Sequence, residues 1–147
     1  VATTAPGLSF NAGHEAAVNV LTQGLIDEGI IQASLEEATE KGLYRPFYMH
    51  RTGHWLGLDV HDAGPYRETE EDADEPDWRR LEPGMVLTIE PGLYITPESG
   101  APEKFWNIGI RIEDDAVVTE TGCELITRGV PVARQEIEAL VQSGKLG

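Results

Sequence analysis

The order of the predicted elements indicates an α+β fold. Apolar residues recur at helical spacing in the first third of the chain, and aromatic, β-branched and glycine-rich segments follow from Phe47 onward. A further helical pattern closes the chain after Pro131. The chain thus has helices first, then mostly strands, then one helix. This order differs from the strand–helix alternation of an α/β fold with a parallel sheet. The length of 147 residues suits one domain, which we place at residues 1–147.

Two helices are predicted before Phe47. The first runs from Ser9, a plausible N-cap after Pro6-Gly7, towards Gly29, and its apolar face is formed by Phe10, Ala17, Leu21 and Leu25. We expect His14 on this helix to pack or to face solvent rather than to bind a ligand. In the second helix, Ser34 and Glu37 have the spacing of a capping box, and we expect Arg45-Pro46 to end it.

The strands are predicted in the second half of the chain. Met85–Ile89 is an apolar run bounded by two Pro-Gly pairs. In residues 108–113, isoleucines alternate with Gly109, Arg111 and Glu113, the period of a half-buried strand, with Ile108, Ile110 and Ile112 on one face. Turns are expected at Asp114-Asp115 and Thr121-Gly122. The closing helix has an apolar face of Val132, Ile137, Leu140 and Val141.

Charge and cysteine content exclude several classes of partner. The net charge is −15, with 26 acidic and 11 basic residues, which argues against nucleic acid or an anionic membrane surface as partner. The acidic run in residues 64–80 is expected to be a solvated loop. No apolar run approaches the roughly 18 residues of a membrane span. Cys123 is the single cysteine, so no internal disulfide can form, and we expect a reducing, cytoplasmic location.

Three of the four histidines lie within twelve residues, "HRTGHWLGLDVH", at His50, His54 and His61. Imidazole is the commonest protein ligand for transition metals. The spacings of four and seven residues do not match a helical HExxH site. A three-histidine zinc site is conceivable, and from the residues alone a functional cluster and a chance cluster remain equally open.

Two glutamates could add oxygen ligands to this cluster. Glu90 ends the apolar strand, where it either points to solvent or needs a partner. Glu113 shares a strand face with Arg111, as a solvent-facing ion pair or as part of a buried polar site. One His with two Glu would suit Mn²⁺, Fe²⁺, Co²⁺ or Zn²⁺. The sequence has no glycine-rich phosphate loop, no GxSxG elbow and no convincing Cys-His pair, which disfavours a serine or cysteine hydrolase.

Three segments together resemble one family. "HRTGHWLGLDVHDAG", "LEPGMVLTIEPGLYI" and "GIRIEDD" are similar, in content and order, to the motifs of Xaa-Pro aminopeptidases (aminopeptidase P), in the metallopeptidase group that also holds prolidase and methionine aminopeptidase. The resemblance runs from about Pro6 to the end. It implies the second half of a pita-bread domain, an antiparallel sheet with covering helices. It also implies peptides with proline in second position as substrates.

The resemblance also implies roles for single residues. His54, Glu90 and Glu113 match three of the family's five metal ligands, and Glu90 would also relay a proton. His50 and His61 match substrate-binding histidines, and His61 would help to stabilise the transition state. Arg111 and Tyr94 match residues that surround the metal site. The cofactor implied is a divalent metal, Mn²⁺ first, with Zn²⁺, Co²⁺ or Fe²⁺ as alternatives.

The match departs from the family upstream of the histidines. The family's two aspartate ligands precede its histidine ligand, whereas the only aspartate before His54 here is Asp27, on the first predicted helix. We therefore expect the C-terminal half of a catalytic domain, inactive alone, with a dinuclear site only if an upstream Asp pair is supplied. We also expect pairing with a second copy or with a missing N-terminal segment. The alternatives are a non-catalytic peptide- or protein-binding module on the same fold, and prolidase.

Overall fold

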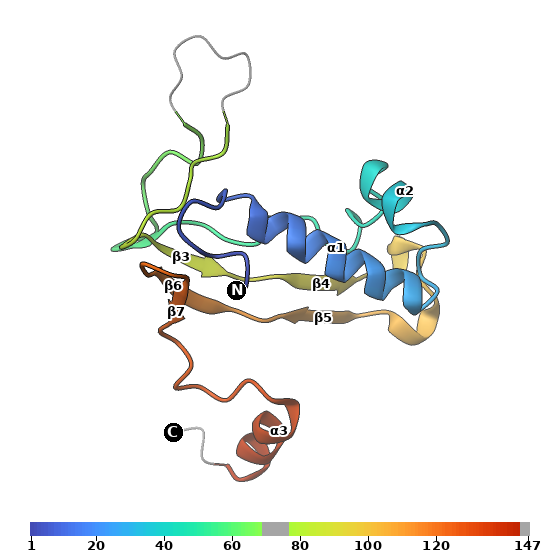
Figure 1. The fold of residues 1–147 in the computed structure, drawn as a ribbon. Coiled ribbons are helices and arrows are strands. Elements are labelled where there is room, and N and C mark those ends of the chain that lie inside the picture. The colour runs from blue at the N-terminus through green and yellow to red at the C-terminus, as the bar shows by residue number, and fades with distance from the viewer. Residues whose placement is uncertain (69–76, 145–147) are drawn as a thin grey trace.

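The computed structural model describes residues 1–68 and 77–144 and has the predicted α+β class (Figure 1). Every pair of strands in this part of the chain is antiparallel. Helices α1 and α2 lie over the strands, whereas α3 lies apart from this layer, below it in Figure 1. The centre of the predicted acidic loop, residues 69–76, lies outside the described residues.

Helix α1 (Ala12–Asp27) begins later than the sequence predicted. Its N-cap is Asn11 and not Ser9. Ser9 forms an antiparallel bridge with Arg80, and the backbone N–H of Phe10 donates to the carbonyl oxygen of Arg79. These tertiary bonds hold Ser9 and Phe10 outside the helix, so Phe10 packs in the core rather than on the helix face.

Helix α2 (Leu35–Glu40) begins as predicted and ends earlier. The Ser34 hydroxyl accepts a hydrogen bond of 3.1 Å from the backbone N–H of Glu37. The helix ends at Lys41, its C-cap, because Gly42 adopts a left-handed conformation with φ of 63°. Arg45-Pro46 therefore plays no part in ending it.

The strands form one interrupted antiparallel ribbon. Strand β3 (Val86–Ile89) pairs with β6 (Asp114–Val118), and β4 (Gly92–Ile95) pairs with β5 (Ile108–Arg111). The residue pairing of β3 with β6 continues in step into the pairing of β4 with β5. The segment that runs from β3 into β4 therefore lies alongside the segment that runs from β5 into β6, in the opposite direction. A bond from the Ile112 N–H to the Pro91 carbonyl, 3.2 Å, spans the interruption. This register places Glu90 directly opposite Glu113.

Shorter elements complete the fold. Strand β7 (Cys123–Leu125) pairs with β6 after the predicted turn at Thr121-Gly122, where the Thr119 N–H donates to the Gly122 carbonyl. Strands β1 (Leu56–Gly57) and β2 (Val60–His61) form a small hairpin. Two 3₁₀ turns, Pro97–Ser99 and Glu103–Phe105, connect β4 to β5.

The predicted turn at Asp114-Asp115 is wrong. Both residues belong to β6, because the chain continues from β5 into β6 without reversing. Asp114 is only 5% exposed, and its carboxylate lies 2.7 Å from Nη2 of Arg128. The Thr127 hydroxyl donates to the same carboxylate at 3.1 Å. Asp114 is thus a buried, partnered side chain of the sheet.

Two hydrophobic clusters form the core. The first joins α1 and α2 to β4 and consists of Leu25, Ile31, Ala38, Phe47, Ile95 and Ala101. The second joins the N-terminal segment to β3 and β6 and consists of Phe10, Trp55, Leu81, Leu87 and Val118. Neither cluster includes a residue of β5, so the helices cover only one strand of the β4–β5 pair.

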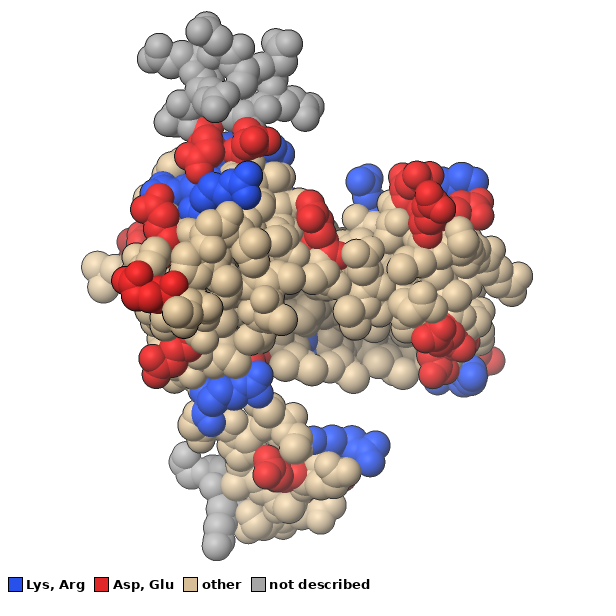
Figure 2. All heavy atoms as spheres, viewed as in Figure 1, with Lys and Arg blue, Asp and Glu red and all other residues tan. Residues whose placement is uncertain are grey.

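The prediction that β5 is half-buried is wrong for this reason. Ile108, Ile110 and Ile112 are 39%, 59% and 57% exposed. Helix α3 (Arg134–Gln142) forms as predicted, yet its apolar residues Ile137 and Val141 are also exposed. Figure 2 shows acidic and basic side chains mixed near the edges of the molecule, with an almost uncharged face over α1. In the part of the chain that the structure describes, no helix is long and apolar enough to cross a membrane.

Candidate metal and substrate site

Two carboxylates meet at the interruption of the ribbon. Like charges directly opposite each other in an antiparallel pair repel unless a cation lies between them. Arg111 supplies that cation from the same strand face as Glu113. Its Nε lies 3.8 Å from Glu90 Oε2, and its Nη2 lies 3.3 Å from Glu113 Oε2. The side chain of Glu90 is only 14% exposed, whereas that of Glu113 is 39% exposed. Because water screens the charge of Glu90 less, the positive charge of Arg111 stabilises Glu90 more than Glu113.

His54 reaches the same place from the other side of β3. The segment of residues 52–55 runs antiparallel to β3, with bonds from the Thr88 N–H to the His54 carbonyl (2.9 Å) and from the Glu90 N–H to the Thr52 carbonyl (2.6 Å). As a result, His54 Nε2 lies 3.3 Å from Glu90 Oε1. Gly53 permits this approach, because a Cβ there would lie 2.1 Å from the Thr88 carbonyl oxygen.

The hydrogen bonds of His54 determine which nitrogen is free to bind. Its Nδ1 lies 2.8 Å from the carbonyl oxygen of Trp55. A carbonyl oxygen can only accept, so Nδ1 carries the proton. In the neutral imidazole, Nε2 then presents its lone pair beside Glu90, which is the arrangement of a metal-binding histidine oriented by a backbone carbonyl.

Thr88 is a residue of this site that sequence reasoning missed. Its hydroxyl accepts a hydrogen bond of 3.1 Å from the His54 N–H and donates one of 3.0 Å to Glu90 Oε1. Thr88 is 2% exposed and stands in an otherwise apolar strand, "VLTI". A buried hydroxyl in an apolar strand needs partners, and that requirement was the available signal.

The other two histidines flank this centre through aromatic contacts. Nδ1 of His50 donates to the Arg51 carbonyl at 2.7 Å, so its Nε2 accepts from the Tyr94 hydroxyl at 2.9 Å. The exposed ring of His61 packs edge-on against His54, with 4.0 Å between ring centroids. The fold therefore places His61 beside His54 and joins His50 to Tyr94, which lies 44 residues further along the chain.

The predicted metal-ligand set is brought together only in part. In residues 1–68 and 77–144, no three His, Cys, Asp or Glu side chains are grouped closely enough to hold a metal ion. His54 Nε2 and Glu90 are adjacent, whereas Glu113 is joined to Glu90 through Arg111. An imidazole nitrogen beside carboxylate oxygens is a donor set that suits a divalent transition metal.

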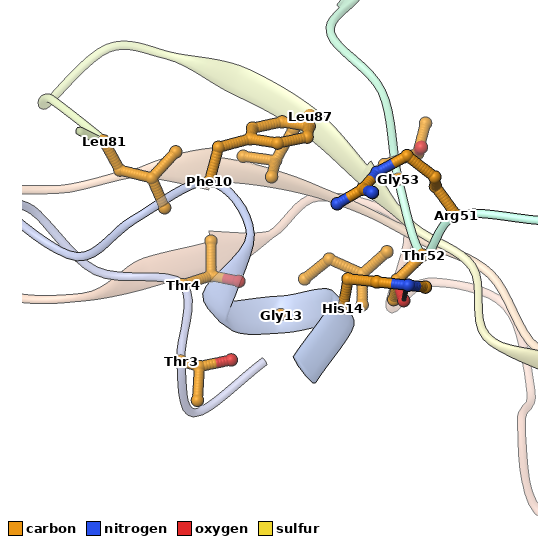
Figure 3. Close-up of a pocket in the computed structure, with 12 residues that line it drawn as sticks. Thr3, Thr4, Phe10, Gly13, His14, Arg51, Thr52, Gly53, Leu81 and Leu87 are labelled. Carbon is orange, nitrogen blue, oxygen red and sulfur yellow. Dashed lines mark hydrogen bonds between the residues drawn. The ribbon is translucent and has the colours of Figure 1, made fainter. Parts of the chain in front are cut away.

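The fourth histidine lies behind this site, in a small cavity beneath α1 (Figure 3). The cavity has a volume of about 20 Å³, and its lining includes His14, Arg51, Thr52 and Thr88. Nδ1 of His14 lies 3.1 Å from the Thr52 hydroxyl oxygen. Burial and, to a smaller extent, the positive charge of Arg51 lower the pKa of His14 from 6.5 to about 4.

The chain is similar to proteins of one known family. A family model described as metallopeptidase family M24 matches residues 1–120. The chain is 46% identical over 140 residues to the Xaa-Pro aminopeptidase of Escherichia coli K12, covering 95% of this chain and 30% of that protein. The chain thus spans about a third or less of the length of the relatives it matches.

Solved structures show the same likeness. The aminopeptidase PepP of Pseudomonas aeruginosa superposes with a TM-score of 0.89 at 48% identity, covering 99% of this chain and 32% of that one. Zinc-substituted E. coli aminopeptidase P in complex with product gives a TM-score of 0.83 at 46% identity, covering 98% and 31%. The fold is therefore part of the pita-bread fold of these enzymes. With the family model matching most of its length, the chain belongs to metallopeptidase family M24.

Proposed function

We propose that this chain supplies one side of the active site of a metal-dependent Xaa-Pro aminopeptidase. His54, Glu90 and Glu113 would hold a divalent metal, Mn²⁺ first, with Zn²⁺, Co²⁺ or Fe²⁺ as alternatives. The observation that carries the proposal is the 3.3 Å approach of His54 Nε2 to Glu90 Oε1 at two side chains that are each 14% exposed. The substrates would be peptides with proline in second position, the class named by the relatives' descriptions.

The residues of this chain would divide the chemistry between them. A bound divalent ion would polarise the scissile carbonyl and activate water. Glu90 would accept and return a proton, while Thr88 and Arg111 hold its two oxygens in place. His61, exposed beside His54, would donate to the charge that develops on the substrate oxygen. His50, oriented by Tyr94, would contact the peptide.

Metal binding is tested by isothermal titration of the chain with Mn²⁺. We expect a single weak site, lost in the Glu90→Gln variant and retained in Glu98→Gln, an exposed glutamate in the connection between β4 and β5. Equal binding by both variants would contradict the assignment of Glu90 as a ligand.

On its own, this chain is expected to hydrolyse little peptide. It contributes one histidine and two glutamates to the site, and a dinuclear centre would need an aspartate pair that it does not contribute. A Gly-Pro-type peptide assay in Mn²⁺ buffer should show activity near background. Full turnover by a monodisperse monomer would overturn this part of the proposal.

One observation favours a second candidate, a non-catalytic peptide- or protein-binding module. Arg111 already compensates both carboxylates, so Glu90 and Glu113 can share a site without a metal. The metal content of the purified chain separates the two candidates, since a module of this kind would carry no stoichiometric metal. Within the catalytic proposal, comparing tripeptide with dipeptide substrates on a full-length protein would separate aminopeptidase P from prolidase.

We further propose that the uncovered face of β5 is an association surface. Its three isoleucines are 39% to 59% exposed along a strand that pairs on one side only among the described residues. Its occupant would be a second copy or polypeptide outside this chain, and a well-behaved monomer in light scattering would exclude the second copy. We also propose a cytoplasmic location, on the single cysteine.

A further inference from the structure

A partly buried chain of hydrogen bonds connects α1 to the candidate site. The hydroxyls of Tyr48 and Thr52 contact each other, and Nδ1 of His14 lies 3.1 Å from the same Thr52 oxygen. Tyr48 is 1% exposed and Thr52 is 5% exposed. Figure 3 shows His14 on α1 directed at Thr52. None of these three residues has a role in the proposed chemistry.

The direction of these bonds follows from counting protons. Burial lowers the pKa of His14 to about 4, so its imidazole is neutral near pH 7 and has one lone pair. If Tyr48 donates to Thr52 and Thr52 donates to His14 Nδ1, every hydroxyl proton has an acceptor. The reverse order would leave the buried Tyr48 proton without an acceptor among the described residues, which is unfavourable because a buried donor is then desolvated without a hydrogen bond. The first order is therefore favoured.

Both hydroxyl residues also contact the candidate site. The Thr52 carbonyl accepts the Glu90 N–H at 2.6 Å, which fixes the backbone of Glu90. The ring of Tyr48 packs edge-on against His50, with 5.1 Å between centroids and 81° between planes. A fixed position of Thr52 therefore holds the Glu90 backbone in place through their hydrogen bond. A fixed position of Tyr48 restricts the orientation of the His50 ring that packs against it.

We propose that His14 is a positioning residue of this site. By accepting a hydrogen bond from Thr52, it anchors the segment of residues 48–52 to α1, and that segment holds His50 and the backbone of Glu90 in place. The functional meaning of this anchor depends on the proposed peptidase site, whereas its structural effect does not. Thr22, further along α1, offers a control, because it is fully buried and its hydroxyl has no hydrogen-bond partner among the described residues.

The test uses the whole chain and two pairs of variants. Thr52→Val and His14→Leu remove one partner each, while Thr52→Ser and His14→Asn keep a hydroxyl or an acceptor. Nuclear magnetic resonance follows the His50 imidazole and the Glu90 amide, and titration with Mn²⁺ measures affinity. We expect Thr52→Val and His14→Leu to shift both resonances and to raise the Mn²⁺ dissociation constant about tenfold. Thr52→Ser and His14→Asn should restore both.

The control variant is Thr22→Val, which removes a buried hydroxyl from the same helix and should leave both readouts unchanged. The proposal is overturned if Thr52→Val and His14→Leu change the resonances no more than Thr22→Val does. It is also overturned if the conservative pair fails to restore them. If the parent chain binds no Mn²⁺, the metal part of the proposed function fails, yet the resonances still decide the role of His14.

Discussion

Protonation of His14 should account for part of the stability that this chain loses in acid. Replacing His14 by Asn should remove that contribution. The pKa of this imidazole is about 4 in the folded protein, below its usual 6.5, because of burial first and the charge of Arg51 second. Glu15 opposes this effect, and His50 adds to it weakly. Between pH 6.5 and 4 the unfolded chain binds a proton that the folded chain does not. Stability is therefore lost as the pH falls through this window and changes no further below it.

The magnitude follows from the two pKa values. At pH 5 the difference corresponds to about 2 kcal/mol by linkage. His14 is only partly buried, and solvent screening reduces the expected effect to about 1 kcal/mol. His14→Asn keeps an acceptor for Thr52 and removes the titration.

Urea unfolding at pH 7.5 and pH 5.0 measures this effect. The parent should lose about 1 kcal/mol more than His14→Asn between these two pH values. His61→Asn, which removes an exposed imidazole, is the control and should behave as the parent does. If parent and His14→Asn lose the same stability to within about 0.3 kcal/mol, His14 does not carry the acid response.

Three further predictions concern packing and association. Gly53→Ala should destabilise the chain by about 1–3 kcal/mol and weaken Mn²⁺ binding, because the new Cβ would clash with the Thr88 carbonyl oxygen. An unchanged urea midpoint and an unchanged Mn²⁺ titration would show that the segment around Gly53 can move away from β3. Asp114→Ala should lower the free energy of unfolding in urea by about 3 kcal/mol, because it leaves Arg128 without its carboxylate partner. The half-exposed Arg128 regains part of this energy by binding water. A loss smaller than that of Asp115→Ala would refute the structural role of Asp114. Ile110→Glu should abolish any self-association seen by light scattering, and association that persists would place the interface away from β5.

Local sequence determined the elements that depend on local chemistry. The N-cap at Ser34 begins α2 as predicted, because the hydrogen bond that forms it joins residues only three positions apart. The β3 strand and the turn at Thr121-Gly122 also follow from local residue preferences. The motifs that resemble Xaa-Pro aminopeptidases identified the family, since they preserve residue type and order over most of the chain.

Tertiary structure decided what depends on distant segments. Pairing of Ser9 with Arg80 shortened α1, and the continuous passage from β5 to β6 made Asp114 a buried strand residue instead of a turn. Alternation in β5 correctly predicted that Arg111 and Glu113 share a face, but it could not show that the helices leave the isoleucine face uncovered.

The candidate site shows the same division most clearly. The sequence by itself determined which side chains are available: a histidine cluster and two glutamates that end or follow apolar strands. Only the tertiary structure decided that Glu90 faces Glu113, that Arg111 compensates both, and that Thr88 joins His54 to Glu90. The physical reason is that strand register and backbone approach at Gly53 set these distances, and both arise from pairing between segments at least 13 residues apart in the chain.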